Sequence, residues 1–152
     1  RQFGTEDQGW VAHFLIRALA GEPISVYGDG KQVRDILHVD DAVSAYRATL
    51  ASIDRVKGGV FNLGGGPPNS VSILGVLREI EKLTGRPLET SFGPWRAGDQ
   101  YFFVADTRKL ERELGWQARV RWRSGIRHLA EWLVEHRFGG RPLLAAPERI
   151  PA

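Results

Sequence analysis

The sequence predicts an α/β fold in which a small mixed sheet carries helices. Apolar residues recur at helical spacing in several segments, and short apolar runs typical of strands lie between those segments. Glycine or proline marks most junctions, where turns are expected. Because helices and strands alternate along the chain without a visible repeat, the pattern is typical of an α/β domain.

In the first half of the chain, the pattern predicts a helix over residues 9–20, with Asp7 available as its cap, and a strand over 24–27. The carboxylates of the Asp40-Asp41 pair favour the start of a second helix, because acidic groups stabilise a helix N-terminus. The apolar run 60–63 follows two glycines and is expected to form a buried strand.

The second half is expected to begin with a helix that Ser70 or Ser72 opens and Gly85 ends. Further expectations are a strand at 88–92, a loop at 93–100, an extended run at 101–105, a helix that Asp106 and Thr107 cap and that runs to Leu114, and a helix at 124–136. The glycine- and proline-rich tail beyond Phe138 is expected to be loose.

Composition bounds the class of protein. With 152 residues, of which 42% are apolar, the chain can bury one core. Its 21 Lys and Arg against 18 Asp and Glu give a formal charge of +3, and the basic residues are scattered. The absence of cysteine excludes disulfides and a thiol nucleophile within the chain, and no apolar run is long enough to span a membrane. We expect a cytoplasmic protein with neither membrane nor nucleic acid as a partner, and the lack of Met even at position 1 suggests a fragment.

Three segments carry groups that suit a phosphate ligand. The first is the start of the 9–20 helix, where the backbone amides near Trp10 and Val11 and the positive end of the helix dipole favour an anion. Every helix has such an end, so this segment alone discriminates little.

The second segment runs from Val26 to Asp35, where a strand leads into a glycine turn and then into Arg34. A guanidinium group can donate two parallel hydrogen bonds to phosphate oxygens, whereas Lys31 could approach only as a point charge. The alternative interpretation is a hairpin with a surface pair between Arg34 and Asp35.

The third segment is the loop 94–100. Arg96 and Asp99 lie three residues apart on this glycine-containing loop, so both can face one ligand, the arginine toward phosphate and the aspartate toward sugar hydroxyls. The alternative is a salt bridge within the loop.

Together, these segments resemble a known family. The matching stretches are, in order, Arg1–Gly4, Pro23–Gly30, Val33–Asp41, Phe61–Gly66, Arg96–Asp99, Asp106–Lys109 and Leu114–Trp116. Their order and spacing resemble the extended short-chain dehydrogenase/reductase family, specifically its NAD-dependent epimerase/dehydratase members, up to about Trp132. The opening stretch looks most like the branch that contains CDP-paratose 2-epimerase, while UDP-glucose 4-epimerases and dTDP-glucose dehydratases share the later stretches.

The resemblance implies a nucleotide-sugar-binding C-terminal domain over residues 1–138, after which the tail that composition predicts to be loose takes residues 139–152. It implies that backbone amides support the diphosphate, that two arginines hold the pyrophosphate from two sides, that a tyrosine borders the base and that an aspartate accepts hydrogen bonds from ribose hydroxyls. The amides are those of Trp10 and Val11, the arginines are Arg34 and Arg96, the tyrosine is Tyr27 and the aspartate is Asp99. Gln32 and Gln100 are their polar neighbours.

The chain departs from the family in lacking the cofactor half. Members carry an amino-terminal Rossmann half that holds NAD, and a Tyr-x-x-x-Lys pair whose tyrosine acts as the acid/base. Only Tyr27 has a lysine four residues on, at Lys31, and this tyrosine ends a strand instead of sharing a helix face with its lysine. The triplet 64–66 lacks the G-x-G-x-x-G order of a dinucleotide turn. We therefore expect no catalytic, cofactor-binding or metal-binding residue in this chain, with NAD held by the missing half.

The leading hypothesis is the substrate half of an NAD-dependent nucleotide-sugar epimerase. This half would anchor a CDP-, UDP- or dTDP-sugar, would be inactive alone, and would belong to an intact homodimer. One alternative is a dehydratase of the same family, which differs chiefly in residues of the missing half. Others are a non-enzymatic basic module that binds nucleic acid, and a poorly folded remnant whose apolar surface lacks its cover.

Overall fold

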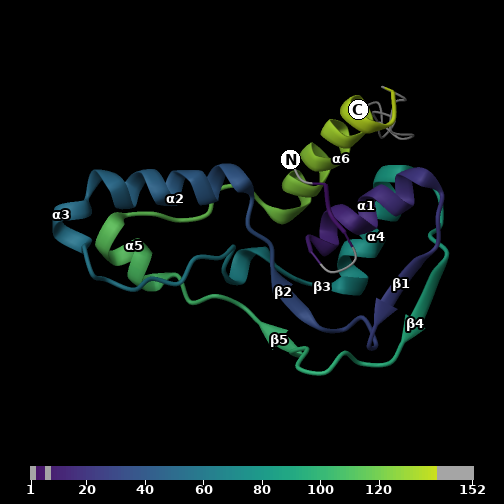
Figure 1. Cartoon of the computed structure of the whole chain (residues 1–152), viewed down its shortest axis with the longest axis horizontal. Coiled ribbons are helices and arrows are strands. Elements are labelled where there is room, and N and C mark those ends of the chain that lie inside the picture. The colour runs from purple at the N-terminus through teal and green to yellow at the C-terminus, as the bar shows by residue number, and fades with distance from the viewer. Residues whose placement is uncertain (1–2, 6–7, 140–152) are drawn as a thin grey trace, which may run out of the picture. The chain divides into compact units, whose positions relative to one another are not determined.

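The computed structural model describes residues 3–5 and 8–139 (Figure 1). Helices and strands alternate along these residues, which confirms the α/β prediction. The elements are α1 (Trp10–Ala20), β1 (Ile24–Tyr27), β2 (Val33–Asp35), α2 (Val39–Ala51), α3 (Ile53–Val56), the 3-10 turn η1 (Pro67–Asn69), β3 (Ser70–Ser72), α4 (Ile73–Thr84), β4 (Thr90–Gly93), β5 (Phe102–Phe103), α5 (Arg108–Leu114) and α6 (Trp122–Arg137).

The chain groups into two compact units. The first unit takes the residues up to Lys31, Ser72–Asp99 and those from Ile126 onward, and the second takes Gln32–Val71 and Gln100–Gly125. The domain boundaries expected at 138 and 139 stay a prediction, and residues 140–152 of the expected tail lie outside the described residues.

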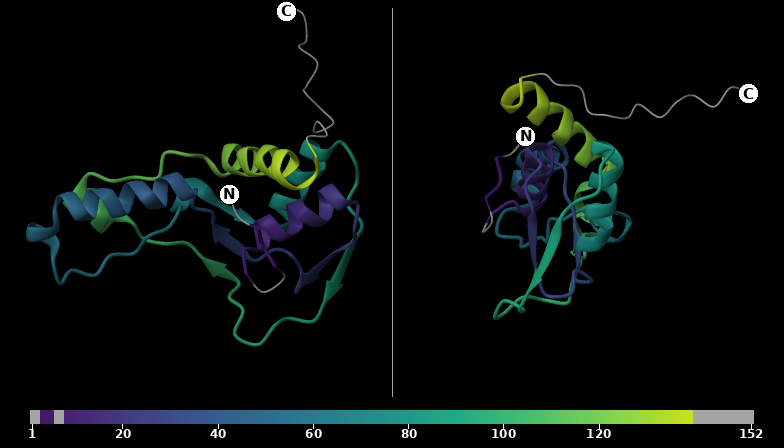
Figure 2. Two further views of the ribbon diagram at one scale, coloured as in Figure 1. Left: turned by 45° about the horizontal axis from the view of Figure 1, so that its top comes forward. Right: turned by 90° about the vertical axis from the view of Figure 1, so that its right-hand side faces the viewer.

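The first unit is built on a parallel pair of strands. β1 and β4 pair from Ile24 opposite Thr90 to Tyr27 opposite Gly93. The helices α1 and α4 pack against each other beside these strands (Figure 2). The core holds fully buried aliphatic side chains from α1, β1, α4 and α6. Among them are Leu15, Ile24, Ile80, Ile126 and Leu133.

The ends of α1 and α4 follow from local backbone chemistry. Gly21, at φ 73°, ends α1 in the left-handed conformation that glycine tolerates, and Gly85 ends α4 in the same way at φ 68°. Of the two serines expected to open α4, Ser72 is the cap, because its Oγ accepts a hydrogen bond from the Gly75 N–H at 3.1 Å. The cap residue of α1 is Gly9, and the expected Asp7 lies outside the described residues.

The second unit combines a short sheet with a helical cluster. Its strands lie in the order β3-β2-β5, with β2 and β5 parallel and Val33 opposite Phe102. Helices α2 and α5 meet around the buried side chains of Ala45, Leu110 and Trp116. No helix of the described residues is long and apolar enough to cross a membrane.

Two sequence-based interpretations are wrong. The run 60–63 is not a strand: Phe61 and Leu63 pack on the helical cluster, Val60 is 80% exposed, and the run has no partner strand among the described residues. Without such a partner, an apolar run cannot form a ladder. The hairpin alternative for 26–35 also fails, because β1 and β2 belong to different sheets.

Candidate functional site

The carboxyl edge of the parallel pair β1–β4 brings two predicted site residues together. Tyr27 ends β1 and Gly93 ends β4, and the register places them opposite each other. The loop after β4 brings the Arg96 guanidinium to 3.9 Å from the centroid of the Tyr27 ring. A cation this close to an aromatic face is attracted by its quadrupole, and ligands of open α/β sheets bind outside this edge. The geometry therefore places an aromatic ring and a positive charge side by side where a ligand is expected.

Gly28 allows this loop to lie close to β1. Its φ is +87°, and a Cβ at this position would lie 2.9 Å from the Trp95 indole. The Gly28 N–H also donates to the Gly93 carbonyl at 3.0 Å. Sequence reasoning did not assign a role to Trp95, although a tryptophan in a loop with no other large apolar side chain was the available signal.

The turn after Tyr27 is anchored on both sides. The Asp29 carboxylate accepts from the Lys31 N–H at 2.9 Å, and the Gly30 carbonyl accepts from the Leu74 N–H at the start of α4, also at 2.9 Å. Tyr27 thus ends a strand, as predicted, and does not share a helix face with Lys31.

Arg96 and Asp99 stand at the two ends of a tight turn. The Asp99 N–H donates to the Arg96 carbonyl at 3.1 Å, and Gly98 takes φ +80° between them with open space around its Cα. A turn closed in this way holds its first and fourth residues near each other. The turn brings the main chains of the two residues close together, and it stays a prediction that both side chains face one ligand.

The start of α1 also belongs to the first unit. The first N–H groups of any helix, here including those of Trp10 and Val11, have no acceptor within the helix. Gly4 packs directly against this end: a Cβ there would lie 2.3 Å from the Gly9 carbonyl oxygen. The Trp10 ring lies edge-on to Phe14, with centroids 5.7 Å apart, so it also packs along its own helix.

The remaining predicted site residues, Gln32, Arg34 and Gln100, lie in the second unit. Gln32 is 2% exposed, Arg34 is half-buried in β2, and Gln100 is exposed. One Arg34 Nη donates to the Val33 carbonyl at 2.8 Å. The Asp35 carboxylate, for which a surface pair was the alternative, accepts from the main-chain N–H of Gly66 at 2.8 Å and of Ala105 at 3.2 Å.

The glycine triplet 64–66 is explained by packing. A Cβ on Gly64 would lie 2.3 Å from the Asp35 carboxylate, and one on Gly65 would lie 2.1 Å from the Ile36 carbonyl oxygen. The backbone of this loop must therefore touch the end of β2, which requires residues without side chains. These glycines have a structural reason that needs no dinucleotide.

A buried asparagine that sequence reasoning missed joins the loops of the second unit. Asn69 is 1% exposed; its oxygen accepts from the Trp122 N–H at 2.9 Å, and its amide donates to the carbonyls of Gly65 and Val120 at 3.3 and 3.2 Å. Nothing in the Pro-Pro-Asn stretch marks this residue as buried, because two of its three partners, Val120 and Trp122, lie more than fifty residues further along the chain.

The Asp40-Asp41 pair opens α2, as predicted. The N-cap is His38, whose Nδ1 accepts from the Asp40 N–H at 3.2 Å. Asp41 is buried, and its carboxylate accepts from the main-chain N–H of Arg119 at 3.1 Å and of Val120 at 2.9 Å. Among residues 3–5 and 8–139, no group of three or more His, Cys, Asp or Glu side chains could hold a metal ion.

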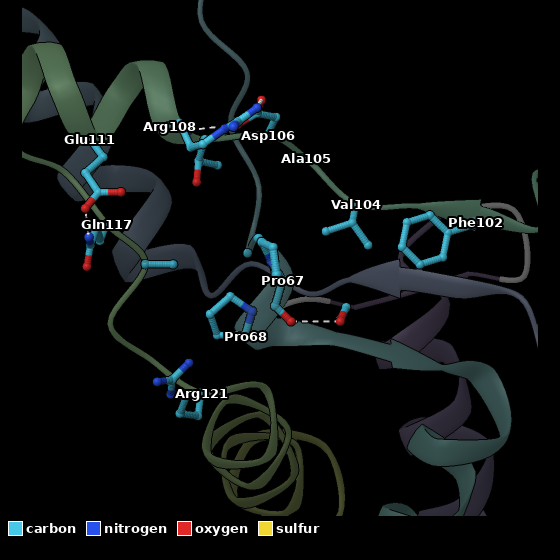
Figure 3. Close-up of a pocket in the computed structure, with 15 residues that line it drawn as sticks. Pro67, Pro68, Phe102, Val104, Ala105, Asp106, Arg108, Glu111, Gln117 and Arg121 are labelled. Atoms are coloured by element: carbon cyan, nitrogen blue, oxygen red, sulfur yellow. Dashed lines mark hydrogen bonds and ion pairs between the residues drawn. The ribbon is translucent and has the colours of Figure 1, made fainter.

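The second unit also contains an open pocket of about 680 Å³ (Figure 3). An apolar wall of the pocket is formed by Phe102, Val104, Pro67 and Pro68. Arg121 lies at the border of the pocket. Several polar groups at the rim already bind one another, since Arg108 pairs with Asp106 and Gln117 donates to Glu111. No predicted site residue lines this pocket.

The electrostatics of that rim centre on one exposed pair. The hydrogen bond from the Arg108 side chain, helped by the Arg108 main-chain N–H, lowers the pKa of Asp106 to about 2. The same hydrogen bond raises the pKa of Arg108. Both groups therefore stay charged at neutral pH and fix the start of α5.

With this geometry described, comparison with known proteins gives the family. Residues 1–64 match the NAD dependent epimerase/dehydratase family. The resemblance found in the sequence is to this same family. It is 36% identical over 137 residues to the CDP-paratose 2-epimerase of Salmonella typhi, covering 87% of this chain and 40% of that protein. It is 34% identical over 144 residues to a dTDP-glucose 4,6-dehydratase of Xanthomonas campestris, covering 90% and 40%.

A solved epimerase shares the fold. The UDP-glucose 4-epimerase of Thermotoga maritima, solved with UDP-glucose, superposes with a TM-score of 0.75 at 32% identity, over 84% of this chain and 40% of that one. The chain thus spans about 40% of the length of the relatives it matches. The resemblance found in the sequence is confirmed at the level of the family and of a partial fold.

Proposed function

We propose that this chain binds the nucleoside diphosphate of a sugar nucleotide, as the substrate-binding part of an NAD-dependent nucleotide-sugar epimerase. The observation that carries the proposal is the contact of Arg96 with Tyr27 at the carboxyl edge of β1 and β4. A nucleotide needs a flat apolar surface beside its base and a forked cation at its pyrophosphate, and this pair offers both. The similarity to an epimerase solved with UDP-glucose supports the same ligand class.

Each predicted residue has a role that its chemistry allows. In the first unit, Tyr27 borders the base, Arg96 binds the pyrophosphate, Asp99 accepts from ribose hydroxyls, and the amides of Trp10 and Val11 donate to phosphate oxygens. In the second unit, Arg34 is assigned to phosphate, with Gln32 and Gln100 as its polar neighbours.

The chain's own contribution is positioning. NAD, which the family name includes, would accept a hydride from the sugar and return it. The triplet 64–66 does not fit a dinucleotide turn, because its glycines pack against β2. This chain would instead hold the nucleotide so that the sugar reaches a cofactor bound elsewhere, and we expect the chain alone to be inactive with added NAD.

Calorimetric titration with CDP, UDP and dTDP tests the proposal. Arg96→Ala and Arg34→Ala should each weaken binding by on the order of 1.5–3 kcal/mol, because each removes a charge-assisted hydrogen bond. Arg112→Ala is the matched control, since Arg112 is an exposed arginine that pairs with Glu113 at 3.5 Å. Equal affinities for Arg96→Ala and Arg112→Ala would remove Arg96 from the site.

A dehydratase of the same family is the second candidate, favoured by the 34% identity to the Xanthomonas enzyme. Product analysis after coexpression with a cofactor-binding half would distinguish the two activities. An epimerase keeps all hydroxyl groups of the sugar, whereas a dehydratase removes water from it. A nucleic-acid-binding module would instead bind DNA or RNA with a steep salt dependence and ignore the three nucleotides.

A further inference from the structure

The open pocket of the second unit is separate from the residues assigned to the nucleotide. Its volume of about 680 Å³ falls within the range of small-molecule sites, roughly 300–1,000 Å³. All of its lining residues belong to the second unit, and none of them is assigned to the base, the ribose or the pyrophosphate. The chemistry of this lining therefore indicates a ligand of its own.

Strand alternation builds the apolar wall of the pocket. Successive side chains of a strand point to opposite faces. Phe102 and Val104 line the pocket, whereas Phe103, which lies between them in the sequence, does not. Pro67 and Pro68, from the 3-10 turn η1, continue the wall (Figure 3). None of these four lining side chains carries a hydrogen-bonding group, so the wall suits a flat and apolar body.

Most charged groups of the lining already have a partner within it. Asp106 and Arg108 form an ion pair, and the Glu111 carboxylate accepts a hydrogen bond from the Gln117 amide. Figure 3 shows Glu111 beside Gln117 and apart from Arg121. A ligand that reaches Arg121 therefore does not have to replace either of these pairs.

Arg121 is the other cation of the lining. Its side chain is exposed, and it forms no hydrogen bond or ion pair with any residue that the structure describes. It lies at the border of the pocket on the side of Pro68 (Figure 3). A guanidinium group donates parallel hydrogen bonds to the oxygens of a carboxylate or a phosphate. An available cation beside an apolar wall thus matches a ligand that is apolar at one end and anionic at the other.

We propose that this pocket binds a small aromatic anion. Its aromatic body lies against Phe102 and the two prolines, and its carboxylate or phosphate group binds Arg121. The two anionic groups present similar oxygens to a guanidinium group, and the experiment below distinguishes them. The proposal goes beyond nucleotide binding and does not depend on it.

An NMR titration of this chain with three probes of one shape tests the proposal. Naphthoate carries a carboxylate, naphthyl phosphate carries a phosphate, and naphthamide is neutral. At least one of the anions should bind on the order of three- to tenfold more tightly than the amide, because an exposed charge pair contributes modestly. The methyl resonances of Val104 and Ala118, which both line the pocket, should shift to saturation. The anion that binds more tightly identifies the anionic group of the ligand.

Matched substitutions test the two ends of the site separately. Arg121→Gln should remove the preference for the anion, whereas Arg119→Gln should keep it, because Arg119 is an exposed arginine of the same loop that does not line the pocket. Phe102→Ser should weaken the binding of all three probes by a similar factor, and Phe103→Ser should not. All four side chains are exposed, so each variant is expected to fold.

Several outcomes would overturn the proposal. The absence of saturable binding, or equal affinity for the anions and the amide, would show that the pocket does not select an aromatic anion. An equal loss of preference in Arg119→Gln and Arg121→Gln would remove Arg121 from the site. Displacement of naphthoate by CDP would show that the probe binds at the nucleotide site instead. If CDP does not bind this chain and naphthoate binds as expected, the proposed nucleotide function fails and this proposal stands.

Discussion

The two units bury their apolar side chains to very different degrees. Of the twenty buried apolar residues among the described part of the chain, fourteen lie in the first unit, while nine of the eleven exposed large apolar residues lie in the second. The first unit has buried helices and a parallel strand pair, whereas the second is joined largely by side-chain-to-backbone hydrogen bonds such as those of Asp35, Asp41 and Asn69.

This difference separates what each unit can do alone. Burial of apolar surface is the main favourable contribution to folding, so the first unit carries most of the chain's own stability. The second unit leaves more of its large apolar side chains exposed. A ligand site formed by the first unit's loops therefore rests on the unit that buries more of its apolar side chains.

The largest test of the contrast compares two identical substitutions. Leu15→Ala in the first unit should cost about 2–5 kcal/mol, because Leu15 is fully buried and its truncation leaves a cavity. Leu50→Ala in the second unit should change the free energy of unfolding by less than about 0.5 kcal/mol, because Leu50 is 72% exposed. Urea unfolding followed by circular dichroism measures both. Similar costs at the two sites would refute the contrast.

Asn69 tests how far polar contacts hold the second unit. Asn69→Ala should cost about 1–3 kcal/mol, because it leaves the buried Trp122 N–H without the oxygen it donates to. Asn62→Ala is the matched control and should be close to neutral, since Asn62 is exposed and donates only at 3.4 Å, to the Asp106 carbonyl. Hydrogen exchange at the Trp122 amide should rise in the first variant alone; unchanged exchange would deny Asn69 this role.

Local patterns predicted the helices and the first strand well. The periodicity and glycine stops located α1, β1 and α4 to within a few residues, because these elements carry their own start and stop signals. The run 60–63 failed, because apolar composition reports burial in the whole fold and not the presence of a partner strand.

The site was predictable only in part. Arg96 and Tyr27 were found through resemblance and chemistry, and their contact follows from strand pairing between segments more than sixty residues apart. Trp95 and Asn69 were missed, since the roles of both depend on neighbours supplied by tertiary structure. The sequence alone does not show which groups pack against Trp95 or which donors and acceptors surround Asn69.

Two glycines with the same backbone strain sharpen the account of the first unit's loops. Gly28→Ala and Gly98→Ala both place a side chain at positive φ, a cost of about 1–2 kcal/mol for each. Only the Cβ at Gly28 meets another group, the Trp95 ring at 2.9 Å, while Gly98 has open space. Gly28→Ala should therefore be the more destabilising, and it should shift the Trp95 fluorescence or its indole N–H resonance. Identical effects would mean that the Trp95 side chain moves aside without a cost in free energy.

The smallest expected effect concerns the exposed Asp106–Arg108 pair of the second unit. The hydrogen bond from Arg108 lowers the pKa of Asp106 from 3.8 to about 2, so the folded state favours the ionised carboxylate. Its contribution to stability is therefore complete above pH 4 or so and is lost as the pH falls through about 2. NMR titration of the Asp106 carboxyl carbon should give a midpoint near the lower value, and Arg108→Ala should return it toward 3.8, with Arg112→Ala causing a smaller shift because it removes only a weaker Coulomb attraction. Because exposed ion pairs contribute little, stability at neutral pH should hardly change in Arg108→Ala. A large loss of stability at neutral pH in Arg108→Ala would show that polar contacts hold the second unit at its surface as well as at its buried loops.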